Sequence, residues 1–352
     1  MRLKSSLIFS ALTVIGSIAG SPGTLHAHRG FGGQVCSLGT AGVGQPATLI
    51  CKNVLTGSTT QSISVGPTVS AAGGIGGSLA SSADRVLVTN QAGGALLFKQ
   101  ADGRLKSPIK LETNGEGSLS GALSSNGAYV LTGSLLRFFP NGQTWASSSQ
   151  QLLIGDGSAA QVTLSNHFAY VSEKNGSLEA FALARDGSIV GKATAVSGIS
   201  PGTIVGITAA RDLVVAPIAH LASNFNQATI TVSGATSQVQ VVPTKEVAAC
   251  WAANDDGEVC VTNPGSMTVS CGRLGADGFE SYTSAAASLV GESVFDLDVR
   301  DGLVGFQAVR AGTPMLLTYS RGSRSDFLTF VSEFPIGTAQ AAGALLLPAI
   351  SR

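Results

Sequence analysis

Few residues of this sequence have side chains suited to catalysis, and they lie in loops rich in Gly, Ser and Ala. His220 stands in the longest of these loops, "APIAHLASNFNQA" at 216–228, four residues before Asn224. An imidazole titrates near neutral pH, so it suits proton transfer in general acid–base catalysis. We therefore take His220 as the candidate acid or base. A surface histidine without a chemical role is the alternative.

Other polar and aromatic residues could complete such a site. Glu246 and Glu292 could each orient the imidazole, while Arg310 could clamp a carboxylate of the substrate. Asn224 would add a hydrogen-bonding side chain. Trp251 could stack on a ring-shaped substrate or pack within the core, and the sequence leaves both readings open.

Metal and cofactor motifs are weak or absent in the sequence. Glu116, Asp156 and Asp296 could supply oxygen ligands to calcium, but no compact DxDxDG loop accompanies them. The cysteines have no CxxC spacing that would favour zinc. The sequence also lacks a convincing Walker loop, dinucleotide fingerprint or G-x-S-x-G elbow. We predict no metal and no cofactor.

The five cysteines indicate disulfides if the protein is exported. Cys36 and Cys51 flank a Gly/Pro-bearing loop symmetrically, as two cysteines facing each other across a hairpin would. Cys260 and Cys271 are likewise symmetric about "PGSM". We predict these two pairs, with Cys250–Cys260 as a rival to the second. Cys250 is then expected to be free and buried.

The N-terminus has the features of an export signal. Positive charge in "MRLK" precedes the short apolar run "SLIFSALTVIGSIAG". Residues 1–27 are therefore the predicted signal peptide, cleaved after Ala19 or Ala27, and an uncleaved membrane anchor is the alternative. The mature protein is expected outside the cytosol, secreted to the extracellular space or the periplasm, where thiols form disulfides.

Composition narrows the classes of partner. The 352 residues contain 21 Lys+Arg and 21 Asp+Glu, so no excess charge favours nucleic acid or an anionic membrane surface. Only 12% of residues are charged, whereas 45 are Gly. That composition favours short strands joined by tight turns.

A repeat of bends organises the chain. The apolar residues that follow successive bends are spaced 41 to 45 residues apart, at Leu87, Tyr129, Tyr170, Val214, Val259 and Val304. Such a period is typical of four-stranded propeller blades. It predicts six full units over about 73–337.

The two ends of the chain supply a seventh unit. Residues near 34–66 offer up to three strands, and residues near 341–350 look like an innermost strand with nothing after it. We predict an all-β, seven-bladed propeller over 28–352, a single domain whose ring is closed by the N- and C-terminal segments. Closure would leave no unpaired sheet edge.

The segments "GGSLASSADRVLVTNQAGGALLFKQADGRL" and "LSNHFAYVSEKNGSLEAFALARDGSI" resemble blades of the lactonase-like propeller family. The segment "VAACWAANDDGEVCVTNPGSMTVSCGRLGADG" resembles a blade of exported members. This family includes bacterial 6-phosphogluconolactonases and carboxymuconate-cyclizing enzymes. The resemblance implies activity on a small lactone.

Two functions are therefore expected as alternatives. One is the opening or closing of a small lactone at the mouth of the central channel, by His220, Glu246 and Glu292 with Arg310, Trp251 and Asn224 binding the substrate. The other is non-catalytic binding of a small molecule, glycan or protein there. Both alternatives predict a monomer that does not bind nucleic acid and, once the signal is removed, does not associate with membranes.

Overall fold

The computed structural model describes residues 33–69, 78–199, 202–210, 212–219, 227–232, 239–244, 246–275, 278–283, 293–321 and 328–350. The predicted signal peptide, residues 1–27, lies outside this part of the chain. The described residues form strands, turns and isolated bridges without helices, which confirms the all-β prediction. Among them, no helix is long and apolar enough to cross a membrane.

The 28 strands of the described residues form seven four-stranded antiparallel sheets, here called blades one to seven. Blades one to three contain β4 (Leu79–Ser81), β5 (Arg85–Val88), β6 (Ala95–Ala101) and β7 (Arg104–Leu111); β8 (Ser120–Leu123), β9 (Gly127–Leu131), β10 (Leu135–Pro140) and β11 (Ser148–Gln151); β12 (Ala159–Leu164), β13 (Phe168–Glu173), β14 (Leu178–Leu183) and β15 (Ile189–Ala195).

Blades four to six contain β16 (Thr208–Ala210), β17 (Leu213–Ile218), β18 (Gln227–Val232) and β19 (Val239–Pro243); β20 (Trp251–Asp255), β21 (Glu258–Asn263), β22 (Thr268–Gly275) and β23 (Gly278–Thr283); β24 (Ser293–Arg300), β25 (Leu303–Arg310), β26 (Thr313–Arg321) and β27 (Leu328–Pro335). Blade seven joins β28 (Gln340–Leu347) to β1 (Gln34–Thr40), β2 (Pro46–Asn53) and β3 (Thr59–Pro67).

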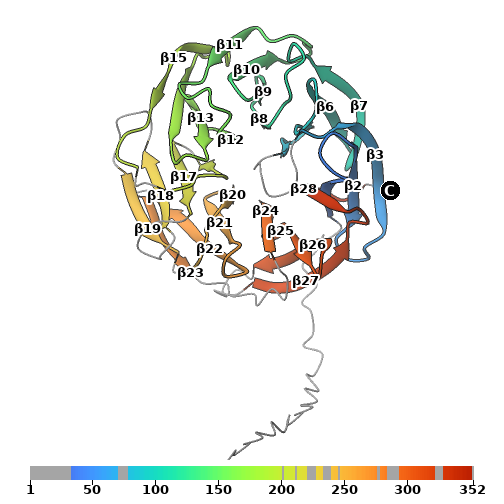
Figure 1. Cartoon of the computed structure of the whole chain (residues 1–352). Coiled ribbons are helices and arrows are strands. Elements are labelled where there is room, and N and C mark those ends of the chain that lie inside the picture. The colour runs from blue at the N-terminus through green and yellow to red at the C-terminus, as the bar shows by residue number, and fades with distance from the viewer. Residues whose placement is uncertain are drawn as a thin grey trace, which may run out of the picture. The chain divides into compact units, whose positions relative to one another are not determined.

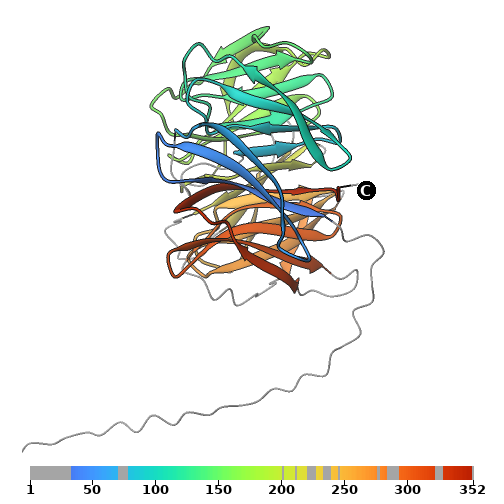
Figure 2. The same ribbon diagram turned by 90° about the vertical axis from the view of Figure 1, so that its right-hand side faces the viewer.

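The blades are arranged as in a propeller, with one strand of each nearest the centre (Figure 1). These innermost strands are the first strands of blades one to six, together with β28 of blade seven. Each contacts the next, and β28 contacts both β24 and β4. Figure 2 shows the blades stacked beside one another in side view.

The repeat read from the sequence corresponds to the second strand of blades one to six. Its six marker residues lie on these strands and are 0% exposed: Leu87, Tyr129, Tyr170, Val214, Val259 and Val304. Each second strand is covered by sheet on both sides, so its apolar residues are excluded from water. The period of the sequence therefore marks the most buried strand of each repeat.

The core lies between neighbouring blades. Tyr129 and Phe138 of blade two pack with Val171 and Phe181 of blade three in one apolar cluster. The rings of Tyr129 and Phe138 are 4.9 Å apart. Because each blade buries both faces against its neighbours, it depends on them for stability.

Blade seven brings together the two ends of the described chain. β28 pairs antiparallel with β1, and Cys36 lies opposite Leu345. The predicted combination of residues near 34–66 with residues near 341–350 is therefore present. Blade one lies against this junction of the two chain ends, called the seam below. There Gly103 has a φ of +70°, and a Cβ on it would stand 2.4 Å from the carbonyl oxygen of Ala349. Only glycine fits that close approach without strain.

Both predicted disulfides are present, Cys36–Cys51 and Cys260–Cys271, and the rival pair Cys250–Cys260 is not formed. Each joins directly opposite residues of adjacent strands, with Cα atoms 4.0 Å apart. Cys250 is free, as predicted, but is partly rather than fully buried. Burial raises the pKa of its thiol to about 12. The two disulfides are consistent with an oxidising, extracellular environment.

Candidate functional site

A central channel runs between the innermost strands. A cavity of about 240 Å³ is lined by residues from the innermost strand, or the residue just before it, of all seven blades. Its polar side chains are those of Ser81, Gln161, Thr163, Thr208, Asn254, Asp296 and Asp298. In the part of the chain that the structure describes, no Arg, Lys or His lines this cavity. The channel can therefore offer hydrogen bonds and negative charge to a ligand.

Two aspartates come from the same strand, β24. Alternate residues of a strand point to the same side, so Asp296 and Asp298 both reach the channel. The carboxylate of Asp298 accepts hydrogen bonds from the backbone N–H groups of Leu346 (2.8 Å) and Val299 (3.0 Å).

Burial raises the pKa of Asp298 to about 6, because the loss of solvation outweighs those two hydrogen bonds. The charge of Arg300 lowers this pKa, and that of Asp255 raises it. Asp298 thus exchanges a proton close to neutral pH.

One face of the propeller carries the connections into the innermost strands and those between second and third strands. We call it the mouth face. In blade three, these two connections meet where the backbone N–H of Lys174 donates to the carbonyl oxygen of Ser158 at 2.9 Å. The backbone N–H of Ser158 donates to Asp156 Oδ1 at 2.8 Å, which shapes the turn before β12.

Ser158 and Glu173 form a hydroxyl–carboxylate pair where these two connections of blade three meet, a place called the corner below. Ser158 Oγ donates to Glu173 Oε2 at 2.6 Å. Ser158 is half-buried, whereas Glu173, the last residue of β13, is 0% exposed. Its other oxygen, Oε1, is buried and has no hydrogen-bond partner within the described residues. A ligand at the mouth would therefore meet the hydroxyl, with the carboxyl behind it.

The pKa of Glu173 is raised to about 7, chiefly by burial. The hydrogen bond from Ser158 lowers it, the charges of Glu179 and Asp156 raise it, and Lys174 lowers it. A base is most effective when its pKa lies near the working pH, so this carboxyl is suited to take a proton near neutrality.

Glu179 of β14 fixes the connection before β12. Its carboxylate is 1% exposed and accepts the backbone N–H groups of Leu153 (3.0 Å) and Ile154 (3.1 Å). Burial raises its pKa, and these two bonds lower it. Burial also lowers the pKa of Lys174, which the charge of Glu173 raises. The corner is therefore a rigid arrangement of partly desolvated charges.

Three of the residues predicted for catalysis or binding, His220, Asn224 and Glu292, lie outside the described residues. Glu246 is half-buried in the connection before β20, where its backbone N–H donates to Thr244 Oγ1 at 3.3 Å. The structure does not place Glu246 among the residues of the channel cavity.

Arg310 and Trp251 are engaged with other residues of the protein. The guanidinium of Arg310 is hydrogen-bonded and ion-paired to Glu333 of the outermost strand β27, and Arg310 does not line the channel cavity. Trp251 is 3% exposed and packs edge-on against Phe295, with ring centroids 5.7 Å apart. Of the two roles that the sequence left open for Trp251, the structure shows packing within the core.

The residues considered for calcium come from three different blades. Glu116 pairs with Arg137 at 3.4 Å next to blade two, Asp156 precedes blade three, and Asp296 lies in blade six. They are not among the groups close enough to share one ion in the part of the chain described.

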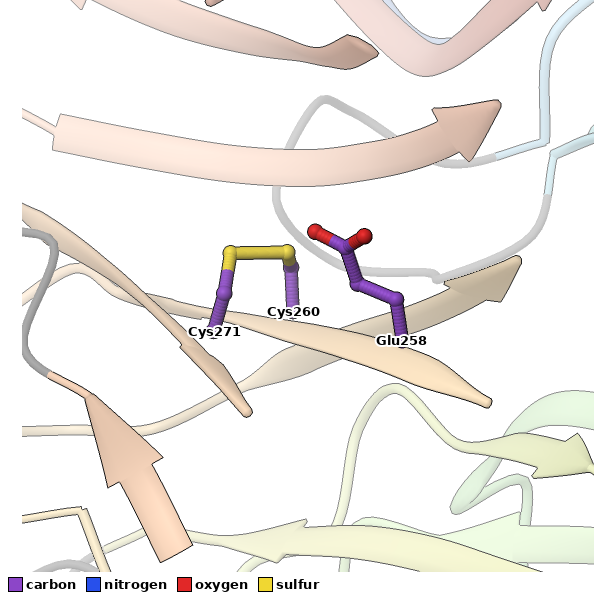
Figure 3. A group of neighbouring side chains, drawn as sticks. All are labelled: Glu258, Cys260 and Cys271. Carbon is purple, nitrogen blue, oxygen red and sulfur yellow. A yellow bond between two sulfur atoms is a disulfide. The ribbon is translucent and has the colours of Figure 1, made fainter. Parts of the chain in front are cut away.

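The group there that has metal-ligand spacing consists of Glu258, Cys260 and Cys271. Both sulfurs are consumed in a disulfide (Figure 3), and Glu258 pairs with Arg321 at 2.8 Å. Metal binding requires free thiolates, so this group does not fit a metal.

Ser158, Glu173 and Glu179 were not among the site residues predicted from the sequence. A signal existed. Glu173 shares a strand face with Val171, and Glu179 shares one with Phe181, and both apolar residues lie in the core. An acidic residue on an apolar strand face is costly unless it serves a purpose.

The comparisons with known proteins show the fold. No family model and no curated protein matches the sequence. A provisionally assigned 6-phosphogluconolactonase from Bacteroides fragilis is similar over 93% of this chain and 99% of its own, with a TM-score of 0.62 and 13% identity.

Two further solved structures are similar. The computationally designed protein Ika8 matches with a TM-score of 0.55 and 11% identity, covering 91% of this chain and 95% of its own. A chain of a nidogen/laminin complex matches with a TM-score of 0.52 and 9% identity, covering 76% and 99%. These unlike proteins share an architecture, so the function has to be argued from the site.

Proposed function

We propose that this protein is an exported, monomeric member of the lactonase-like propellers, with a closed ring of seven blades, that opens a small uncharged lactone at the channel mouth. The observation that carries the proposal is the 2.6 Å hydrogen bond from Ser158 Oγ to the buried Glu173, whose pKa is raised to about 7. A hydroxyl in contact with a base of matched pKa is the arrangement of an activated nucleophile. The similarity to the Bacteroides fragilis protein supports the reaction class.

In the proposed reaction, Ser158 Oγ attacks the carbonyl carbon of the lactone while Glu173 takes the hydroxyl proton. The ring C–O bond then breaks, and Glu173 returns the proton to the departing alkoxide. Glu173 then takes a proton from a water molecule, which attacks the resulting ester, and delivers that proton to the departing oxygen of Ser158. The net change is lactone plus water to hydroxy acid.

The charges around the proposed Ser158 site indicate the kind of substrate. The charges of Asp156 and Glu179 act on Glu173, with Lys174 as the neighbouring cation. A phosphorylated or otherwise anionic sugar would be repelled by this excess of carboxylates, so the proposed substrate is a neutral aliphatic or sugar lactone. The proposed neutral substrate therefore differs from a 6-phosphogluconolactone, which is phosphorylated.

The roles assigned from the sequence remain part of the proposal as an alternative centre. In this alternative centre, His220 transfers the proton and Glu246 or Glu292 orients the imidazole of His220. Arg310, Trp251 and Asn224 bind the substrate. Arg310 would first have to leave Glu333, and Trp251 would have to leave its packing against Phe295. The Ser158 centre needs no such rearrangement.

Non-catalytic binding of a glycan or another hydroxyl-rich small molecule is the second candidate function. The channel lining favours it, because Ser81, Thr208 and Asn254 can exchange hydrogen bonds with sugar hydroxyls beside small apolar residues. Such a protein would bind in the channel and release no product.

The test is hydrolysis of a panel of neutral aliphatic and sugar lactones, followed by proton release. Ser158→Ala and Glu173→Gln are each expected to lower turnover by about 10²-fold or more, as removal of a positioned nucleophile or base does. Ser125→Ala, on the opposite face, is the matched control and is expected to keep full activity. In the wild type, kcat/KM should rise as the pH increases, with an apparent pKa near 7.

A second readout separates chemistry from folding. A serine-reactive fluorophosphonate should label Ser158 in the wild type and lose that label in Glu173→Gln, as peptide mass spectrometry would show. Turnover that survives Ser158→Ala but falls in His220→Ala would move catalysis to the alternative centre. Absence of any turnover above the buffer rate, together with saturable sugar binding, would establish the binding function instead.

A further inference from the structure

A second cavity lies on the face opposite the mouth, between blades two and three. It has a volume of about 610 Å³, within the range of small-ligand sites. Its walls come from the first turns of both blades and from the turn between β14 and β15 of blade three. We call it the blade two–three groove. None of its residues belongs to the channel site except Leu164.

The groove presents a cation and a ring N–H to solvent. Arg185 and His167 are both exposed and line it. Among the described residues, neither side chain has an ion pair or a hydrogen bond. The neighbouring Asp186 is not ion-paired with Arg185 in the described structure, and its Oδ1 accepts the backbone N–H (2.9 Å) and the hydroxyl (2.7 Å) of Ser188.

The backbone around these two side chains is held in place. Asn126 Nδ2 donates to the carbonyl oxygen of Arg185 at 3.1 Å, and the hydroxyl of Tyr129 donates to that of Gly187 at 2.5 Å. The backbone N–H of Leu183 donates to the carbonyl oxygen of His167 at 2.9 Å, which ties the two turns of blade three together. The groove is thus preorganised, which reduces the entropy cost of binding.

Apolar groups lie beside the cation. Leu164 and Leu183 are half-buried and line the same groove, with the fully buried ring of Tyr129. A ligand held here would contact both an apolar wall and a guanidinium. A planar guanidinium matches the two oxygens of a carboxylate.

We propose that the blade two–three groove binds a small organic carboxylate with an apolar body. Arg185 takes the carboxylate as a bidentate partner, and His167 donates a further hydrogen bond. Leu164 and Leu183 contact the apolar part. The site is separate from the mouth and does not depend on the proposed hydrolysis.

The experiment measures binding of phenylacetate to the full-length mature protein by titration calorimetry and by NMR. Phenylacetamide is the uncharged isostere, and inorganic phosphate is the anion without an apolar body. We expect saturable binding of phenylacetate, at least about 10-fold weaker binding of both comparators, and about a 10-fold loss in Arg185→Gln, since a hydrogen bond to a charged group is of this size. His167→Ala should weaken binding to a smaller extent.

Lys99→Gln is the matched control, because Lys99 lines the neighbouring groove between blades one and two. This variant, like Ser158→Ala at the mouth, should bind phenylacetate as the wild type does. The proposal is overturned if phenylacetate shows no saturable binding. It is equally overturned if Arg185→Gln binds unchanged, if Lys99→Gln loses as much affinity as Arg185→Gln, or if phenylacetamide binds as well as phenylacetate.

Discussion

The side-chain amide of Gln34 donates a 3.0 Å hydrogen bond to the carbonyl oxygen of Pro348, which follows 314 residues later in the chain. The same nitrogen donates to the carbonyl oxygen of Gly103 in blade one at 2.7 Å. Gln34 Oε1 accepts from Thr60 Oγ1 at 2.5 Å. One buried amide therefore connects blade seven, the C-terminal segment and blade one.

Gln34→Ala is expected to lower the free energy of unfolding by about 1–3 kcal/mol. It removes the hydrogen bonds to the carbonyl oxygens of Gly103 and Pro348, of which Gly103 keeps Gln61 Nε2 as a donor. Each lost hydrogen bond costs about 0.5–1.5 kcal/mol. Urea denaturation measures the change. Gln143→Ala, at an exposed position of blade two, is the control and should change the midpoint little. An equal effect of both variants would show that the amide at the seam has no special role.

Deletion of the last twelve residues, 341–352, is expected to abolish soluble folding. It removes nearly all of β28, which pairs with β1 and contacts the innermost strands of blades one and six. An exposed edge of β1 and an open apolar face would favour aggregation. Gel filtration of the truncated chain decides this. A soluble monomer with the wild-type circular dichroism spectrum would contradict closure by β28.

Replacement of either disulfide by a pair of alanines is expected to destabilise the fold by about 2–3 kcal/mol. The cysteines are separated by 15 residues in Cys36–Cys51 and by 11 in Cys260–Cys271, and the chain-entropy estimate for such short loops has that size. Thermal denaturation compares the two variants with Cys250→Ala, which removes no bridge. Peptide mapping without reduction checks the pairing, and recovery of a Cys250–Cys260 peptide would show it to be wrong.

Glu173→Gln is expected to make the protein more stable at pH 8. The pKa of Glu173 is raised from 4.5 to about 7, so between these values the folded state keeps a proton that the unfolded chain has released. The contribution of this group to the free energy of unfolding is therefore fully present below pH 4.5. It decreases as the pH rises through the folded-state pKa near 7. The loss amounts to about 1–3 kcal/mol. Gln stays neutral and still accepts from Ser158.

Denaturant unfolding at pH 5 and pH 8 measures this difference. Glu179→Gln is the contrasting variant, because one amide oxygen cannot accept the N–H groups of both Leu153 and Ile154 as the two carboxylate oxygens do. Burial raises the pKa of Glu179 as well, so the lost hydrogen bond should make the gain in stability at pH 8 smaller than that of Glu173→Gln. A Glu173→Gln variant less stable than the wild type at pH 8 would mean that the ionised carboxylate stabilises the fold.

The sequence by itself predicted the blades and favoured the two observed disulfides, with Cys250–Cys260 left as a rival to the second. The spacing of Leu87, Tyr129 and the residues equivalent to them marks the second strands, because the apolar pattern of a buried strand is local and recurs in every repeat. Cys36–Cys51 and Cys260–Cys271 followed from symmetry about a turn, since a hairpin places residues equidistant from its turn opposite each other.

Only the tertiary structure decided which side chains meet. Ser158 and Glu173 are separated by a whole strand pair, and their contact depends on the path of the connection that Glu179 holds against blade three. Arg310 was a plausible clamp by loop position, yet its partner Glu333 lies on another strand of the blade. Charges and hydrogen bonds of this kind depend on distances of a few ångströms between residues far apart in sequence. Strand periodicity specifies the face on which a side chain lies but does not specify its partner.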